Sequence, residues 1–418
     1  MKTYDLCIIG GGAAGLSAAL EAYDDQLDII IIEREKKLGG ILNQCIHNGF
    51  GLHVFKEELT GPEYAQKLID FVHKKKINYM LDTTVLDIEK TKDFKITMSN
   101  IKNGEFSIHS KSVILTTGCY ERTRGHISIP GDRPKGIMTA GSAQRYLNMD
   151  GYLVGRSIFI LGSGDIGLIM ARRMTLEGAK VHGVAEIMPY SNGLTRNVVQ
   201  CLNDFDIPLY LSHTIVDIKG RTNLEEITIQ EIDEHKNFIE GTRKSFKVDT
   251  LLLSVGLIPD VKLFEHLSLD LDIHTKSAIV DQHLETSVAG LFICGNALHV
   301  HDLVDDVTME SQKAGRFAKA YIHGNQNLKK DSKEIFIDEN IQHIIPQVIN
   351  FSHVVDPIEL SFRTLKKYEK VKLTIMQNNQ LIKTKILTYV APAEMQKVII
   401  KTSDLISKDS LYVNLEEV

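Results

Sequence analysis

The sequence predicts an α/β fold, and three observations lead to this prediction. A strand-like run, a glycine-rich loop, a helix-like run and a second strand follow one another at residues 4–33, and the same order recurs at 157–186. Strands that alternate with helical stretches are typical of parallel sheets covered by helices. After about residue 340 the pattern changes to short alternating strand-like runs. We therefore expect two Rossmann-like dinucleotide-binding domains followed by a small β-rich C-terminal domain.

The first glycine-rich loop lies between two strand-like segments. Residues 4–9 are apolar and β-prone, and residues 10–15 (GGGAAG) fit the pattern G-x-G-x-x-G. Residues 16–23 are typical of a helix, and residues 28–33 form an apolar run that ends in an acid, Glu33. This acid lies close to the roughly 20-residue spacing of dinucleotide-binding units.

Each feature of this loop has a physical reason. Gly10 allows a tight turn, Gly12 lets the backbone approach a pyrophosphate, and Gly15 lets the helix pack on the strand. The positive end of the helix then faces the phosphates, and Glu33 accepts hydrogen bonds from a ribose. The alternative is a glycine-rich loop that only packs a helix on a sheet.

The second loop repeats this arrangement. Residues 157–161 are a predicted strand, residues 162–167 (GSGDIG) the loop, residues 168–176 a helix, and residues 180–186 the next strand, which ends in Glu186. An acid at this place suits a free ribose 2′-hydroxyl and repels a 2′-phosphate, which favours NAD over NADP. The alternative is a domain that holds no nucleotide, or that holds another adenine nucleotide.

Three further segments agree with two dinucleotide-binding domains. Residues 112–118 (SVILTTG) are a predicted strand that ends in Thr-Gly. Residues 251–259 (LLLSVGLIP) are an apolar run that ends in the pattern G-x-x-P. Residues 286–296 (TSVAGLFICGN) end in Gly-Asn. With both loops, they resemble the two-dinucleotide-binding-domain flavoproteins of the pyridine nucleotide-disulfide reductase superfamily over about residues 1–325. The resemblance implies FAD at the first loop and NAD(H) at the second. Asn296 replaces the Asp that in this family bonds the ribityl chain.

The resemblance also implies a domain order. It places a discontinuous FAD-binding domain at 1–122 and 270–328, and an NAD(P)-binding domain at 123–269. A linker and a β-rich domain make up 329–418, and the polar stretch interpreted as the linker spans residues 325–338. Small antiparallel insertions are expected near residues 85–109 and 213–249, and a helix at 311–322 is expected to cover the flavin end.

The residues expected to contact the two cofactors come from both loops, the two acids, and the segments that resemble the family. They are Gly10, Gly12, Ala14, Gly15, Glu33, Arg34, Gly40, Asn43, Gln44, Thr117, Gly118, Gly162, Gly164, Asp165, Ile166, Gly167, Glu186, Gly256, Gly295 and Asn296.

The chain departs from the family where a redox dithiol is expected. One branch carries C-x-x-x-x-C after the first unit, where this chain has Leu42 and His47. Thioredoxin reductases carry C-x-x-C before the second loop, where this chain has residues 139–142 (TAGS). Residues 138–145 instead resemble a narrower group: the large subunits of dye-linked proline, opine and hydrogen-cyanide-forming dehydrogenases, and a flavoprotein associated with anaerobic glycerol-3-phosphate dehydrogenase. This resemblance implies a small iron–sulfur or dehydrogenase partner subunit.

Two short segments carry candidate catalytic residues. In this fold the loop at 41–51 passes the flavin ring, so His47 is a candidate proton donor or acceptor. Cys45 is a candidate redox nucleophile, with an ordinary buried thiol as the alternative. Asn43 and Gln44 are expected to bond the ring edge.

The second segment follows Asn296 and contains His299, His301 and Asp302. We expect one of the histidines to line the active site, or a partner to contact them. We predict no metal ion here, because no third ligand has helical spacing. Asp302 is expected to cap the following helix.

Composition excludes several classes of protein. The 418 residues are 43% hydrophobic and 24% charged, as in ordinary globular proteins. The net charge of −6 argues against nucleic acid as a partner. Five scattered cysteines form no disulfide or metal framework, which favours a reducing cytoplasm. No signal peptide and no membrane-spanning run is expected. A homo-oligomer is compatible with the sequence.

Two enzymatic hypotheses follow, with a third that is not enzymatic. The first is an FAD enzyme that moves hydride between NAD(H) and FAD and on to a protein or small-molecule acceptor. The second is a flavoprotein dehydrogenase subunit that oxidises an amine, imino acid or glycerol 3-phosphate-type substrate, with a structural second nucleotide site. The third is a flavin-binding assembly or sensing protein. Glu186 and the intact second loop favour the first.

Overall fold

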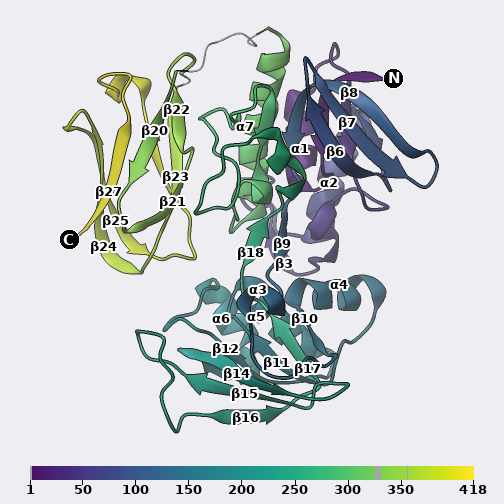
Figure 1. Ribbon diagram of the computed structural model, residues 1–418, viewed down its shortest axis with the longest axis vertical. Helices are drawn as coiled ribbons and strands as arrows, with labels where there is room; N and C mark the ends of the chain where they lie inside the picture. Colours follow the sequence, from purple (N-terminus) through teal and green to yellow (C-terminus); the bar gives the residue numbers. More distant parts are fainter. Residues whose placement is uncertain (1, 325–330, 355) are drawn as a thin grey trace. The chain divides into compact units, whose positions relative to one another are not determined.

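The computed structural model describes residues 2–324, 331–354 and 356–418. The chain forms two compact units, one made of Met1–Cys119 with Pro259–Val418 and the other of Tyr120–Ile258 (Figure 1). Each unit contains a sheet of parallel strands with helices, so the α/β prediction is confirmed.

The first unit is built on a seven-stranded sheet in the order β5-β2-β1-β8-β7-β6, with β19 beside β8. β1 lies in the middle and pairs in parallel with β2 and β8. The four isoleucines of β2 are all buried, as the apolar run predicts for a strand covered on both faces. The strands are β1 (Thr3–Ile9), β2 (Ile29–Ile32), β5 (Asn78–Met80), β6 (Thr84–Lys90), β7 (Phe94–Asn100), β8 (Gly104–Leu115) and β19 (Leu291–Ile293); β3 (Asn48–Phe50) and β4 (Leu59–Thr60) form a separate pair.

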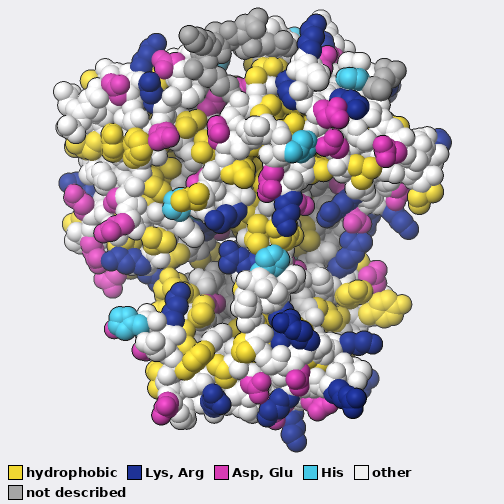
Figure 2. Space-filling view, viewed as in Figure 1, with side chains coloured by type: hydrophobic (Ala, Val, Ile, Leu, Met, Phe, Trp, Pro, Cys, Tyr) yellow, Lys and Arg dark blue, Asp and Glu magenta, His cyan; other side chains and the backbone are white. Residues whose placement is uncertain are grey.

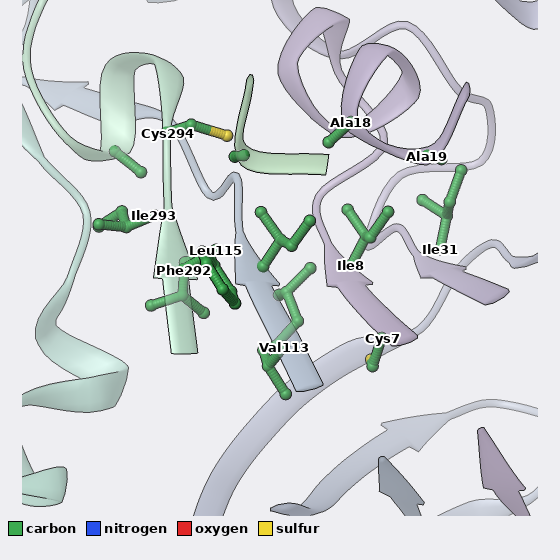
Figure 3. Close-up of a cluster of buried hydrophobic side chains, with 14 of the residues drawn as sticks. Cys7, Ile8, Ala18, Ala19, Ile31, Val113, Leu115, Phe292, Ile293 and Cys294 are labelled. Atoms are coloured by element: carbon green, nitrogen blue, oxygen red, sulfur yellow. The ribbon is translucent and has the colours of Figure 1, made fainter. Parts of the chain in front are cut away.

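The long strand β8 joins the antiparallel part of this sheet to its parallel part. Its first part pairs antiparallel with β7, as the sequence predicts for an inserted hairpin, and its last part pairs in parallel with β1 and β19. Strand β19 comes from far along the chain, so the late segment returns to the first sheet. Figure 3 shows Ile8, Val113 and Phe292, which these three strands contribute to one buried cluster.

Three main helices belong to this unit: α1 (Ala13–Ala22), α2 (Gly61–Lys74) and α7 (Val304–Ile322). The prediction placed the last of them at 311–322, but α7 begins at Val304. α1 and α7 pack so closely that a Cβ added at Gly315 would lie 2.3 Å from the carbonyl oxygen of Ala18.

The second unit has its own five-stranded parallel sheet, in the order β10-β17-β11-β12-β13. A three-stranded antiparallel sheet forms at 213–247 and confirms the predicted insertion. The chain enters the unit along β9 (Cys119–Glu121) and leaves along β18 (Leu257–Pro259). The other elements are α3 (Arg124–Ile127), β10 (Ile137–Thr139), α4 (Ala140–Asp150), β11 (Ser157–Leu161), α5 (Asp165–Leu176), β12 (Lys180–Ala185), α6 (Thr195–Cys201), β13 (Leu209–Tyr210), β14 (His213–Lys219), β15 (Glu226–Glu231), β16 (Lys244–Lys247) and β17 (Thr250–Leu253).

The boundaries of the units differ from the sequence-based domain ranges. The chain returns to the first unit at Pro259, whereas the sequence analysis placed the return at residue 270. The reason is packing, because Val261 and Phe264 are buried in the core of the first unit.

The C-terminal segment is β-rich, as predicted, and its two sheets share a core of their own. One sheet has the order β22-β20-β27-β24-β25 and the other β21-β23-β26. The predicted linker is too long, because residues 332–337 form β20; residues 325–330 lie outside the described part of the chain. The strands are β20 (Ser332–Ile337), β21 (Ile341–Ile345), β22 (Val348–Asn350), β23 (Ile358–Thr364), β24 (Tyr368–Gln377), β25 (Gln380–Val390), β26 (Gln396–Ile400) and β27 (Leu411–Glu417).

This β-rich domain packs on the rest of the first unit through buried polar contacts. The amide of Gln282 donates to the carbonyl oxygens of Asn350 and His353, and its Oε1 accepts from the backbone N–H of Asn350. Ile345 also belongs to the core of the first sheet. The two parts therefore form one unit.

None of the helices in the described ranges is long and apolar enough to cross a membrane. On the face shown in Figure 2, basic and acidic side chains are interspersed.

We predict that Gly315→Ala destabilises the protein by about 1–3 kcal/mol, because a methyl group would be forced against the backbone of Ala18. Urea unfolding of FAD-saturated protein measures this. The control is Gln312→Ala on the same helix, for which we expect a change of less than about 0.5 kcal/mol. Equal stability of Gly315→Ala and wild type would contradict the close packing of α1 on α7.

Candidate functional site

The first glycine-rich loop has no room for side chains at its two ends. Gly10 has a φ of 111°, and a Cβ there would lie 2.4 Å from the carbonyl oxygen of Thr116. A Cβ on Gly15 would lie 1.8 Å from the carbonyl oxygen of Gly10. The Thr116 hydroxyl donates to the carbonyl oxygens of Ile9 and Gly10, which fixes the turn. The loop is therefore held tightly between α1 and the end of β8.

Glu33 anchors this loop from the end of β2. Its side chain is 5% exposed, and its Oε2 accepts from the backbone N–H of Gly11 at 2.7 Å. Its Oε1 accepts from the backbone N–H of Glu35 at 2.8 Å, which leaves lone pairs on the carboxylate for a ribose hydroxyl. Arg34, between them, is exposed.

The N-terminus of α1 is open for an anion. Its N-cap is Gly12, and no side chain caps it. A Cβ on Gly12 would meet only the Cα of Gly40, at 3.8 Å, so the backbones of the two loops face each other with little between them. Ala14 lies in the first turn of this helix. Uncapped N–H groups behind a bare backbone fit a pyrophosphate, so these residues suit the implied FAD.

The second loop has the same construction. Gly162 has a φ of 95°, and a Cβ there would lie 2.0 Å from the carbonyl oxygen of Ser254. The N–H of Gly167 donates to the Ser254 hydroxyl at 3.1 Å. The N-cap of α5 is Gly164, again with no side-chain cap, and Ile166 lies in its first turn. This helix also offers free N–H groups to an anion.

Glu186 occupies the place that Glu33 has in the first loop. It is 3% exposed, its Oε2 accepts from the N–H and the hydroxyl of Ser163 at 2.9 and 2.7 Å, and its Oε1 accepts from the N–H of Met188 at 3.0 Å. The second loop thus has a buried glutamate that accepts from its backbone, as the first has.

Asp165 has a structural contact that the sequence did not indicate. Its Oδ1 accepts from the backbone N–H of Leu194 at 2.9 Å and from the amide of Asn197 at 2.6 Å. The carboxylate therefore ties the segment after Glu186 to the start of α5.

Three other expected cofactor contacts lie where strands end. The Thr117 hydroxyl donates to the carbonyl oxygen of Asp260 at 2.7 Å, and the carbonyl oxygen of Gly118 accepts from the N–H of Asp260. In the second unit the carbonyl oxygen of Gly256 accepts from the N–H of Arg122. These contacts hold the chain where it leaves each sheet.

The loop with Cys45 and His47 follows a short 3₁₀ turn at Gly40–Gln44. The amide of Asn43 donates to the carbonyl oxygen of Leu38, and Gln44 is buried.

The thiol of Cys45 donates to the carbonyl oxygen of Ile41, and burial raises the pKa of this thiol to about 12. Such a thiol stays protonated at neutral pH, which argues against the activated thiolate considered above. His47 packs against the ring of Phe50, with ring centroids 5.0 Å apart.

The two histidines after Asn296 meet a carboxylate that the sequence analysis missed. Nε2 of His299 and Nε2 of His301 lie 2.8 and 3.3 Å from Oε2 of Glu310, on α7. The other oxygen of Glu310 accepts from the N–H of Gly295. We call His299, His301 and Glu310 the His–Glu cluster. Its histidines are almost fully buried, with side chains 2% and 6% exposed, so they do not face solvent.

The prediction that Asp302 caps α7 is wrong. The N-cap of α7 is Leu303, without a side-chain cap. The Asp302 carboxylate instead pairs with Arg363 of β23 and accepts from the N–H of Met395, both in the β-rich domain. Arg363 also donates to the carbonyl oxygen of Val300. The buried guanidinium thus holds the segment that carries both histidines.

Asp305 links the two candidate catalytic segments. It is 2% exposed, and its carboxylate accepts from the N–H groups of Gly51 and Val54, at 3.2 and 3.0 Å. The end of the loop that carries Cys45 and His47 is therefore attached to the start of α7. An acid in the first turn of a helix was a signal in the sequence, but its partners were not.

Comparison with known proteins agrees with this geometry. The sarcosine oxidase subunit alpha of a Corynebacterium is 26% identical over 70% of this chain, which spans only 31% of that subunit. The thioredoxin reductase of Ureaplasma parvum is 24% identical over 78% of this chain and 98% of its own length. The crystal structure of T. acidophilum thioredoxin reductase shares the fold, with a TM-score of 0.63 and 23% identity over 77% of this chain and 99% of that one.

The two anchored loops lie in a stretch that matches one family over most of the chain. Residues 4–318 match the pyridine nucleotide-disulphide oxidoreductases. The chain therefore belongs to the pyridine nucleotide-disulphide oxidoreductase family and is an FAD-dependent oxidoreductase.

Proposed function

We propose that this protein moves hydride between NAD(H) and FAD and passes the electrons to a protein or small-molecule acceptor without a redox-active disulfide. One observation carries the proposal: the chain builds the same anion site twice. Each site has an uncapped helix N-terminus, at Gly12 and Gly164, and a buried glutamate that anchors the loop, Glu33 and Glu186.

The residues present fit two dinucleotides. FAD would be held by the N-terminus of α1 and by Glu33, and NAD(H) by the N-terminus of α5 and by Glu186. The flavin supplies the hydride chemistry, and the protein supplies binding and orientation. Because Glu186 is anionic and buried at the adenosine end, it would disfavour the 2′-phosphate of NADP.

The cysteines support a route without a dithiol. All five cysteines lie in the described part of the chain, and none of them forms a disulfide there. In thioredoxin reductases the dithiol precedes the second loop, and here that segment is the N-terminus of α4. There the Thr139 hydroxyl accepts from the N–H of Ser142, and Glu121 accepts from the N–H of Gly141. The segment is thus a capped helix start rather than a redox site.

A second candidate is a dehydrogenase subunit that oxidises an amine, an imino acid or a glycerol 3-phosphate-type substrate. The observation that favours it is the 26% identity to a protein named as one subunit of sarcosine oxidase. Such a protein would have a partner subunit, such as a small iron–sulfur protein, and a structural second nucleotide site.

We expect NADH to bleach the flavin absorbance near about 450 nm under anaerobic conditions. NADPH should bind more weakly by at least about tenfold, because Glu186 repels its 2′-phosphate. Anaerobic stopped-flow titration with each nucleotide measures both. If neither nucleotide reduces the flavin while dithionite does, the hydride proposal fails. Bleaching by sarcosine, proline or glycerol 3-phosphate would then support the dehydrogenase subunit.

We predict that Gly164→Ala weakens NADH binding by at least about tenfold, because a methyl group would separate the N-terminus of α5 from the pyrophosphate. The new Cβ would lie 3.2 Å from the Ser254 hydroxyl, which has to shift by only a few tenths of an ångström and can still accept from the N–H of Gly167. FAD content and reduction by dithionite should stay unchanged. The matched control is Gly125→Ala in the same unit, where the nearest atom is 3.7 Å from the new Cβ. Equal loss in both variants would contradict a nucleotide site at α5.

We expect no thiolate–flavin charge-transfer absorbance between roughly pH 6 and pH 10. Burial raises the pKa of Cys45 to about 12, so the thiol loses its proton only above this range. Cys45→Ala should reduce with NADH at the wild-type rate. A long-wavelength band that titrates near neutral pH and is lost in Cys45→Ala would show that Cys45 is redox-active.

A further inference from the structure

The His–Glu cluster brings three ligand-type atoms to one point. The Nε2 atoms of His299 and His301 and a carboxylate oxygen of Glu310 all lie within 4.8 Å of one another. Both imidazoles approach the same oxygen, Oε2, at 2.8 and 3.3 Å. When two ring nitrogens converge on one carboxylate oxygen, a positive charge between these atoms stabilises the arrangement. This charge can be a proton on a ring nitrogen or a metal ion.

The hydrogen bonds of His301 indicate which of its nitrogens carries the proton. Its Nδ1 lies 3.0 Å from the carbonyl oxygen of His299 and 3.3 Å from Oδ1 of Asn296. A carbonyl oxygen only accepts, so Nδ1 donates. In the neutral imidazole Nε2 then presents a lone pair toward the Glu310 carboxylate. This contact is repulsive unless a positive charge lies between them.

The groups behind the three ligand atoms are arranged as in metal sites. Histidines that bind metals usually donate their other N–H to a backbone carbonyl or a carboxylate, which fixes the ring. His301 does so through the carbonyl oxygen of His299. Glu310 is held at Oε1 by the N–H of Gly295, at 2.8 Å, so Oε2 is left to the histidines. These hydrogen bonds therefore fix the orientation of the His301 ring and of the Glu310 carboxylate.

A third imidazole lies beside the cluster. His343 of β21 is 8% exposed, and its ring centroid is 6.1 Å from that of His299. Among the described residues, neither its Nε2 nor Nδ1 of His299 has a hydrogen-bond partner. These two buried nitrogens add donor or acceptor capacity beside the cluster.

We propose that the His–Glu cluster binds a divalent transition-metal ion of the zinc class, through Nε2 of His299, Nε2 of His301 and Oε2 of Glu310. Two imidazoles and a carboxylate favour zinc or iron over calcium or magnesium, which prefer all-oxygen sites. The ion joins the segment after Asn296 to α7 and so has a structural role. This inference does not depend on the hydride route, because its tests do not use NADH.

The test measures the metal content of the purified full-length flavoprotein after incubation with zinc chloride and removal of unbound ions. We expect about one zinc ion per chain, and a Tm that falls when a chelator removes it. His301→Ala and Glu310→Gln should each weaken zinc binding by at least about 100-fold. The matched control is His283→Ala, since His283 also lies buried beside an acid, with Nδ1 3.4 Å from Oδ2 of Asp281, but outside the cluster. It should bind zinc as wild type does.

Two results would overturn the proposal. If the wild type holds no zinc and its Tm does not respond to zinc or chelator, the cluster is a buried imidazolium–carboxylate pair. If both cluster variants bind zinc as tightly as wild type, the ion lies elsewhere. The wild-type measurement decides the question even if a variant fails to fold.

Discussion

A buried carboxylate that holds the second residue of a glycine-rich loop is the constraint on which both nucleotide sites depend. Glu33 accepts from the N–H of Gly11, and Glu186 from the N–H of Ser163. Each bond joins the end of one strand to the loop after the preceding strand. The loop therefore turns tightly, and the N-terminus of the following helix stays free of side chains. A buried carboxylate is costly unless it is hydrogen-bonded, and here the loop N–H groups supply those bonds. The same interaction thus stabilises the fold and prepares the anion site.

The second organising feature is the start of α7, where three distant parts of the first unit meet. Asp305 accepts from the backbone after the Cys45 loop, and Glu310 accepts from the Gly295 N–H and the two histidines. Asp302, just before the helix, pairs with Arg363 of the β-rich domain. Each acid is buried or half-buried. Asp305 and Asp302 have partners far away in the sequence, whereas the partners of Glu310 lie within 15 residues of it. The β-rich domain therefore contributes directly to the geometry of this site.

The sequence analysis did not consider Glu310 as a partner of the two histidines. It looked for a third ligand at helical spacing, whereas the histidines lie before α7 and Glu310 lies within it. In a helix that begins at Val304, Glu310 lies about two turns in and points toward the two histidines. The role of Asp302 was wrong for a related reason, because its partner Arg363 comes from a separate domain that local sequence rules do not reach.

The sequence alone determined what depends on neighbouring residues. The order of strand, loop, helix and acid, with glycines at Gly10, Gly15, Gly162 and Gly167, follows from local spacing. The structure adds that a Cβ would clash with Thr116 at Gly10 and with Ser254 at Gly162. The absence of a dithiol, the two antiparallel insertions and the β-rich end are local patterns too. The tertiary structure decided which side chains meet: Asp165 with Leu194, Asp305 with Gly51, and Glu310 with the two histidines. The first two contacts join residues 29 and 254 positions apart, and the contact of Glu310 with His299 spans 11 positions between α7 and the segment before it. All three form only when packing brings these segments together.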